Sequence, residues 1–183
     1  MNFFKIGINK GLNTGLSIHY SGTCGAAREG NICGIPAVAL SLEYAKGQSE
    51  WHYESAAKAA VELIDIVFTE SKKNYELFSR LVINANFPNV AYEEFKGWKL
   101  TKQGLSCYRD SYKLHSQDKD EFGEVVSSKF IIRGDLEMND PDESYDTLAV
   151  LSRYVSVTPL GLIYGSSSST SSVCDSWSLF KSE

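Results

Sequence analysis

GINKGLNTG (residues 7–15) is followed by YSGTCGAAREGNICGIPAVALSL (residues 20–42), and these two stretches decide the fold. Three glycines and two asparagines in nine residues predict a loop at 7–15, where the backbone turns or lies close to another group. The small residues that follow the N-cap candidates Ser21 and Thr23 predict a helix that can approach a sheet closely. Residues 35–42 are apolar on both alternating faces, which is typical of a strand covered on both sides. This order predicts an α/β fold with a parallel sheet.

In the rest of the chain, the spacing of apolar residues predicts a helix and several strands. The predicted elements are a helix at 52–70, a strand at 81–87, a β-ribbon at 96–135 and a last strand at 154–160. Within the ribbon, residues 115–124 are predicted to be a charged turn or a mobile loop. Upstream of the glycine-rich stretch, only Phe3, Phe4 and Ile6 are candidates for a strand. Six carboxylates between residues 135 and 146 lack the spacing of a calcium-binding loop, which favours a solvated acidic loop.

Charge and composition exclude several classes of protein. The 183 residues include 18 Lys and Arg against 23 Asp and Glu, a net charge of −5, which argues against a nucleic-acid partner. No apolar run reaches the ~18 residues of a membrane span, and the N-terminus lacks the apolar core of a secretory signal. The four cysteines form no Cys-x-x-Cys pair, which predicts reduced thiols in a cytoplasmic protein.

The two stretches quoted above resemble the signature of the SurE family. LVINANFP (81–88), FKGWKLTKQG (95–104) and DTLAVLSRYVSVTPL (146–160) resemble later blocks of that family, in the same order. The resemblance covers about residues 5–160 and implies a SurE-like, Rossmann-type three-layer α/β core, truncated at the N-terminus, with an extended β-hairpin region used in oligomerisation. We therefore expect a partial SurE-like domain at 1–160 and a Ser-rich, disordered tail at 161–183.

The resemblance also implies an activity and a site. SurE proteins are metal-dependent phosphomonoesterases of nucleoside 5′/3′-monophosphates, so it implies a divalent cofactor, Mg²⁺ or Mn²⁺, and a nucleoside monophosphate or another phosphate monoester as substrate. Asn9 matches the family's metal-binding asparagine, and Asn13 matches a second asparagine near the substrate phosphate. Ser21, Gly22 and Thr23 match the turn beside the phosphate, where the free N–H groups of a helix N-terminus suit an anion.

One part of the family pattern has no counterpart in this sequence. The family core opens with a strand that ends in Ser-Asn-Asp-Asp-Gly, whose paired aspartates are the principal metal ligands, and a serine from a later loop is a further ligand. No such pair occurs before the signature here. Two hypotheses follow: a SurE-like phosphatase, or a catalytically inactive or truncated module that acts by oligomerisation with itself or with a full-length relative. Neither hypothesis involves a nucleic acid or a membrane.

Overall fold

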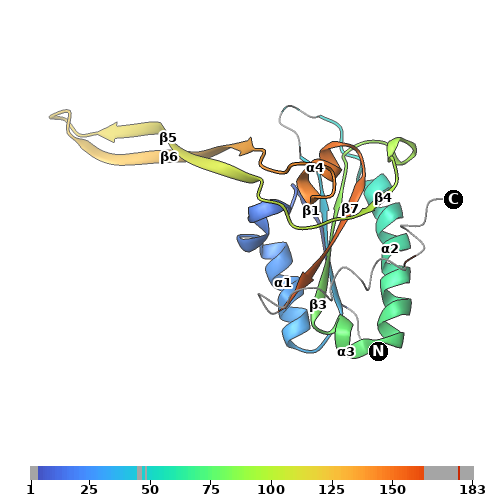
Figure 1. Ribbon diagram of the computed structural model, residues 1–183. Helices are drawn as coiled ribbons and strands as arrows, with labels where there is room; N and C mark the ends of the chain where they lie inside the picture. The colour runs from blue at the N-terminus through green and yellow to red at the C-terminus, as the bar shows by residue number, and fades with distance from the viewer. Residues whose placement is uncertain (1–3, 45–46, 48, 163–176, 178–183) are drawn as a thin grey trace.

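The structure, a computed structural model, describes residues 4–44, 47, 49–162 and 177. A mixed five-stranded sheet is covered by helices on both faces, and a long two-stranded ribbon projects from one end of the molecule (Figure 1). This three-layer α/β core with an extended hairpin confirms the fold class predicted from the sequence.

The central sheet has the strand order β1 (Phe4–Lys10), β2 (Ala37–Leu42), β3 (Leu81–Phe87), β7 (Val155–Gly161) and β4 (Trp98–Leu100). Strands β1, β2 and β3 are parallel to one another, whereas β7 is antiparallel to β3 and β4 is parallel to β7. The carboxyl ends of the three parallel strands therefore meet at one edge of the sheet, which is where ligands bind in open α/β folds.

The prediction of a loop over residues 7–15 is wrong for its first four residues. Residues 7–10 continue β1, and Asn9 and Lys10 pair with Ser41 and Leu42 of β2. Gly7 adopts a φ of +117°, and the β1–β2 register shifts between Ile6 and Asn9. A Cβ at Gly7 would lie 2.3 Å from the Leu40 carbonyl oxygen, so this glycine marks close packing inside a strand rather than a turn.

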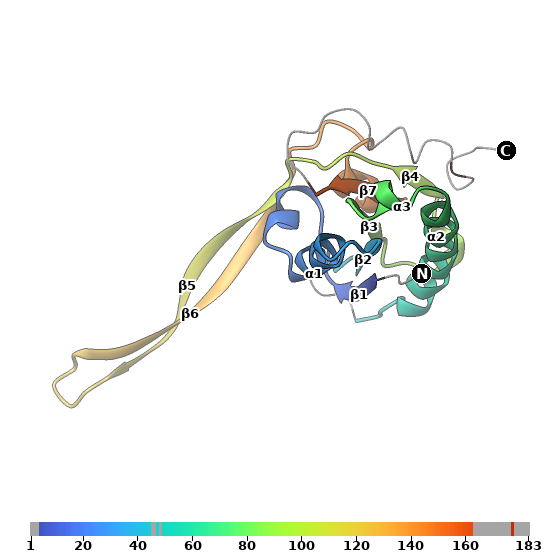
Figure 2. The same cartoon turned by 90° about the horizontal axis from the view of Figure 1, so that it is seen from below.

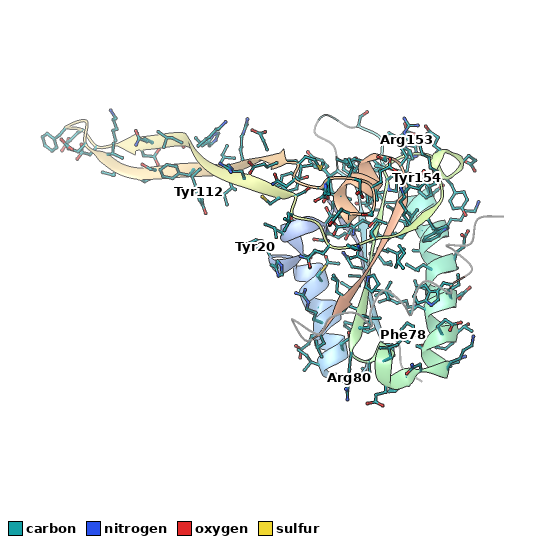
Figure 3. All side chains as sticks on the ribbon, viewed as in Figure 1. Tyr20, Phe78, Arg80, Tyr112, Arg153 and Tyr154 are labelled. Atoms are coloured by element: carbon teal, nitrogen blue, oxygen red, sulfur yellow. The ribbon has the colours of Figure 1, made fainter. Side chains whose placement is uncertain are left out.

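Two helices cover opposite faces of the sheet (Figures 1 and 2). Helix α1 (Gly22–Ile32) lies on one face, and α2 (Tyr53–Lys73) lies on the other, followed by the short α3 (Tyr75–Phe78). On the α2 face the strands present mostly large residues to the core, among them Val38, Leu40, Leu42, Ile83 and Phe87. Phe78 points inward beside them (Figure 3). On the α1 face β2 contributes Ala37 and Ala39, whose small side chains let the helix lie close.

The projecting ribbon consists of β5 (Cys107–Lys119) and β6 (Val125–Glu137), two antiparallel strands of 13 residues each. It is shorter than the predicted 96–135, because β4 joins the central sheet instead. The predicted turn at 115–124 shrinks to residues 120–124, since cross-strand pairing continues as far as Lys119 and Val125. The ribbon extends away from the core and is exposed along most of β6 (Figures 1 and 2).

Four short elements were not predicted: η1 (Gly15–His19), α3, η2 (Tyr92–Glu94) and α4 (Asp146–Leu151). Their lengths of three to six residues leave little periodicity to recognise. The predicted disordered tail at 161–183 lies outside the described residues apart from 161, 162 and 177. Within the described residues, no helix has both the length and the apolar character needed to cross a membrane.

Candidate functional site

A row of polar side chains crosses the sheet near the carboxyl ends of its parallel strands. Asn9 of β1 pairs with Ser41 of β2, Ser41 pairs with Asn86 of β3, and Asn86 pairs with Ser156 of β7. Asn84, two residues before Asn86, lies on the same face of β3, as the alternation of a strand requires. All of these residues except Asn9 are buried. The buried part of the sheet therefore carries polar side chains here, and these need hydrogen-bond partners.

Asn13, in the loop after β1, supplies most of those partners. Its backbone N–H donates to the Asn86 Oδ1 atom at 2.8 Å, and its backbone oxygen accepts from the Nδ2 atoms of Asn84 and Asn86 at 2.8 and 3.2 Å. Its own side-chain Nδ2 donates to the Ser41 hydroxyl at 2.6 Å. The loop is thus fixed to β2 and β3 by four hydrogen bonds in a buried setting, which is an arrangement that rigidifies a site.

Asn9 lies at the open side of this network, on the edge strand. Its Nδ2 donates to the Gly11 carbonyl oxygen at 2.8 Å, and this bond orients the side-chain amide. Asn9 is half-buried, whereas Asn13 is 7% exposed. The two asparagines matched to the family motif therefore differ in access to solvent, with Asn9 the more available of the two to a ligand.

Ser21, Gly22 and Thr23 form the N-terminus of α1. The Ser21 hydroxyl accepts from the backbone N–H of Cys24 at 3.0 Å, so Ser21 is the N-cap, whereas Thr23, the other candidate, lies inside the helix. The helix itself provides no acceptor for the amides of Gly22 and Thr23, because the first turn of a helix leaves its N–H groups unpaired. Gly22 is exposed, so this helix end presents backbone donors and a positive dipole end toward solvent.

Two buried carboxylates hold two neighbouring loops: Asp146 binds the loop after β1, and Asp140 binds the 103–106 loop. Asp146, fully buried at the start of α4, accepts from the Gly15 N–H at 3.1 and 3.0 Å and from the Gly104 N–H at 3.0 Å. Asp140 accepts from the N–H groups of Leu105 and Ser106 at 3.0 and 3.1 Å. The prediction of a solvated acidic loop over 135–146 is therefore wrong for these two residues, which bind backbone amides that a sequence pattern does not reveal.

A glycine is required at position 15, where the loop after β1 meets the 103–106 loop. It adopts a φ of +54°, and a Cβ there would lie 2.0 Å from the Ser106 carbonyl oxygen. The next residue, Leu16, donates its N–H to that same oxygen at 2.9 Å. The Gln103 side chain also donates to the Gly15 oxygen, at 3.0 Å. The segment from Asn13 to Leu16 is consequently held between the parallel strands and the 103–106 loop.

Burial changes the ionisation of two groups here. Burial raises the pKa of the Asp146 carboxyl from 3.8 to about 6, although the N–H groups of Gly15, Gly104 and Thr147 oppose the rise. Burial also raises the pKa of the Cys24 thiol, which keeps it protonated, and its Sγ donates to Asn84 Oδ1 at 3.6 Å. Cys24 is thus a packing residue that ties α1 to β3, because a thiol becomes a nucleophile only when ionised.

The described residues alone do not fit a divalent metal ion. Asn9 offers one neutral amide oxygen, whereas Mg²⁺ and Mn²⁺ are usually held by one or more carboxylates. The buried carboxylates Asp140 and Asp146 accept from backbone amides instead. Among the residues that the structure describes, no three His, Cys, Asp or Glu side chains come together as a group able to hold a metal.

Comparison with known proteins identifies the family. The family model "Survival protein SurE" matches residues 6–110, more than half of the chain. A 5′-nucleotidase SurE from Thermosipho melanesiensis is 37% identical over 156 residues, and one from Clostridium beijerinckii is 38% identical over 154. The alignments cover 85% and 84% of this chain but 56% of each relative. This chain belongs to the SurE family.

A solved structure agrees with this assignment. The crystal structure of the SurE protein from Aquifex aeolicus superposes with a TM-score of 0.66 at 35% sequence identity. The match covers 88% of this chain and 60% of the other. The chain therefore spans about half the length of the curated relatives it matches, and somewhat more of the solved structure.

The predicted site residues come from one segment, and the structure places them around one loop. Asn9 and Asn13 lie at its start, and Ser21, Gly22 and Thr23 lie at its end, where α1 begins. Sequence reasoning missed the residues that hold the loop in place: Ser41, Asn84, Asn86, Asp140 and Asp146. Asn84 and Asn86 could have been recognised from the sequence, since polar residues at alternate positions of an apolar strand all lie on one face.

Proposed function

We propose that the chain forms the phosphate-binding part of a metal-dependent phosphomonoesterase that hydrolyses nucleoside 5′/3′-monophosphates. The observation that carries this proposal is the buried network that fixes Asn13 against Ser41, Asn84 and Asn86. A rigid loop at the carboxyl ends of parallel strands, leading into an unpaired helix N-terminus, is a setting suited to a phosphate group. The printed name of the relatives, 5′-nucleotidase SurE, supports the choice of substrate.

Each predicted residue has a role in this proposal. The amides of Gly22 and Thr23 and the Ser21 hydroxyl bind the phosphate oxygens of the substrate. Asn9 contributes its side-chain oxygen to a divalent ion, Mg²⁺ or Mn²⁺, and Asn13 holds the loop that carries both groups. A cytoplasmic location stays a prediction from the cysteine pattern.

The proposal is tested first by binding and then by hydrolysis. Isothermal titration calorimetry of the whole chain with inorganic phosphate measures the phosphate site without requiring a complete metal centre. We expect binding that weakens in Ser21→Ala, with circular dichroism confirming the fold of the variant. Hydrolysis of nucleoside 5′- and 3′-monophosphates is then followed with Mg²⁺, with Mn²⁺ and with EDTA, for the wild type and Asn9→Ala. A folded chain that neither binds phosphate nor hydrolyses nucleotides contradicts the proposal.

The ribbon favours a second candidate function, that of a non-catalytic module that associates through this arm. Tyr112 and Leu114 of β5 pair with Ile132 and Phe130 of β6, so the four side chains share one face of the ribbon. Their exposed fractions are 72, 51, 58 and 57% respectively, and Tyr112 points away from the strands (Figure 3). Contiguous exposed apolar groups of this kind mark association surfaces.

Sedimentation and pull-down distinguish the partners of such a module. The arm would bind either a second copy of this chain or a full-length relative. A double change, Phe130→Ser with Ile132→Ser, is expected to lower the sedimenting mass of the chain or abolish capture of a full-length SurE relative. Val61→Ser, which removes an equally exposed apolar residue from α2, serves as the matched control. A monomeric wild-type chain that captures no relative removes this candidate.

A further inference from the structure

A cavity of about 580 Å³ lies between the base of the ribbon and Tyr44, which follows β2. Its walls are Tyr44 on the core side and, on the ribbon side, Tyr108, Lys113 and the run from Ile131 to Leu136 of β6. The size falls within the range of small-molecule sites in proteins. Both the ribbon base and the end of β2, two residues before Tyr44, lie at the end of the sheet where the parallel strands finish (Figure 1).

Tyr44 is supported by other aromatic side chains. Its ring stacks on Trp51 with centroids 5.5 Å apart and planes within 5° of each other. Trp51 is held in turn by Tyr53, at 6.1 Å, and by the Lys10 ammonium, 4.2 Å from the indole centroid. Tyr44 nevertheless remains 47% exposed, so a supported aromatic surface is available to a ligand in the cavity.

The cavity is next to the candidate phosphate site. Lys10, whose ammonium is 5.3 Å from the Tyr44 ring, immediately follows Asn9 in β1. Tyr44 itself comes two residues after Leu42, the β2 partner of Lys10. Tyr108, which faces Tyr44 across the cavity, also lines a second cavity with Ser17 and Tyr20. Because Tyr20 immediately precedes Ser21, the N-cap of α1, the cavity adjoins the helix end where we place the phosphate.

Tyr108 closes the opposite side and stays neutral. It is 45% exposed, and burial together with the nearby Glu43 carboxylate raises the pKa of its phenol. A neutral phenol offers both an aromatic face and a hydroxyl that can donate or accept a hydrogen bond. Lys113 and Arg133 contribute positive charge to the ribbon side of the same cavity, and Asp135 contributes one negative charge.

We propose that this cavity binds the nucleobase of a mononucleotide, with the ring of Tyr44 as the stacking surface and Tyr108 as the facing wall. The inference rests on the proposed function, because it takes the phosphate to lie at the loop between β1 and α1. Two tyrosine rings suit a planar base, since each base has a π face, and stacking on an aromatic side chain tolerates any of the bases. The cavity thus selects nucleotides over phosphate esters that lack an aromatic part.

Calorimetric titration of the whole chain separates the base from the phosphate. The ligands are adenosine, adenosine 5′-monophosphate, ribose 5-phosphate and inorganic phosphate. We expect Tyr44→Ala to weaken adenosine and the nucleotide about tenfold, within the range measured for base–aromatic stacking, and to leave ribose 5-phosphate unchanged. Tyr44→Phe, which keeps the ring, restores binding. Tyr75→Ala, at a tyrosine of similar exposure on α3, is the matched control and has no effect.

The outcomes distinguish this inference from the proposed function. Phosphate binding without adenosine binding, or an equal response of all four ligands to Tyr44→Ala, overturns the nucleobase site and leaves the phosphate site standing. Adenosine binding that depends on Tyr44 in a chain that binds no phosphate supports the cavity and contradicts the proposed function. If Tyr44→Ala and Tyr108→Ala lower the sedimenting mass and leave adenosine binding intact, a second copy of the chain occupies the cavity and the inference is wrong.

Discussion

Replacing Asp146 with asparagine should remove a pH dependence from the stability of the fold. The folded-state pKa of this carboxyl is about 6, above its ordinary value of 3.8, so the folded chain holds the proton more tightly than the unfolded chain. The stability that the group contributes is therefore fully present below pH ~4 and is lost as the pH rises toward ~6. Asparagine keeps an oxygen to accept from Gly15 and Gly104 but carries no charge at any of these pH values.

The size of the effect follows from the two pKa values. A shift of about two units corresponds to about 3 kcal/mol between the acidic and neutral limits, at 1.36 kcal/mol per unit. Between pH ~4.5 and pH ~7 the linkage relation leaves about 2 kcal/mol of this difference. Because Asp146 is fully buried, little solvent screening reduces it.

Urea denaturation of the wild type and Asp146→Asn at both pH values measures this directly. Other carboxylates titrate in the same range and contribute equally to both proteins, so the relevant quantity is the change in their difference with pH. We expect the variant to gain about 2 kcal/mol relative to the wild type on going from pH ~4.5 to pH ~7. If the difference in unfolding free energy between the variant and the wild type changes by less than ~0.5 kcal/mol between the two pH values, the reasoning that burial raises the pKa of Asp146 is refuted.

Two further predictions concern the loop and the helix that follow β1. Gly15→Ala should destabilise the fold by ~2–5 kcal/mol in thermal unfolding, because the added Cβ meets the Ser106 oxygen and the φ of residue 15 is positive. Gly25→Ala should instead stabilise α1 by ~0.5–1 kcal/mol, because a Cβ there has no neighbouring atom within 4 Å. Equal effects of the two changes would contradict the close approach at Gly15. Ser21→Ala should lower the free energy of unfolding in urea by about 1 kcal/mol, because the cap on the Cys24 N–H is lost. Ser21→Asn should recover most of this loss, since asparagine is also a good N-cap. Two variants of equal stability would show that the cap contributes little.

The fold was predictable from sequence wherever one periodicity ran for several residues without interruption. The strands at 81–87 and 37–42 and the long helix at 53–73 follow from apolar runs or from 3/4 spacing, since burial on one or two faces imposes those patterns. The order of strands in the sheet was not predictable in this way, because nothing local states that β7 lies between β3 and β4. Pairing between distant strands depends on the packing of the whole chain.

The misjudged segments share a physical cause. Gly7 to Lys10 have the composition of a loop, but tertiary pairing with β2 makes them a strand, with glycine accepting a conformation closed to other residues. Asp140 and Asp146 lie in a segment with the composition of a solvated loop. Asp140 nevertheless binds the backbone amide of Ser106, and Asp146 binds that of Gly15, 34 and 131 residues earlier in the chain. Such partners exist only in the folded chain, so the local sequence gives no sign of them.

The site was predictable in part, for a similar reason. A short motif specifies residues that touch a ligand, and Asn9, Asn13 and the Ser21 turn all come from such a motif and lie around one loop. The supporting residues are dispersed over β2, β3 and α4, at Ser41, Asn84 and Asp146. Their role is to accept or donate one hydrogen bond each, which many residue types can do elsewhere in a fold.

The length of the ribbon has a consequence for hydrogen exchange. Thirteen residues per strand span roughly 40 Å, and an isolated two-stranded hairpin is only marginally stable in water. The amides near the turn at 120–124 should therefore exchange with deuterium through fraying that starts at the tip and leaves the sheet intact. The amides of β2 and β3, buried on both faces, should exchange only when the whole chain unfolds. One covalent chain thus contains two cooperative units, and the weaker one can open and close many times during the lifetime of the other.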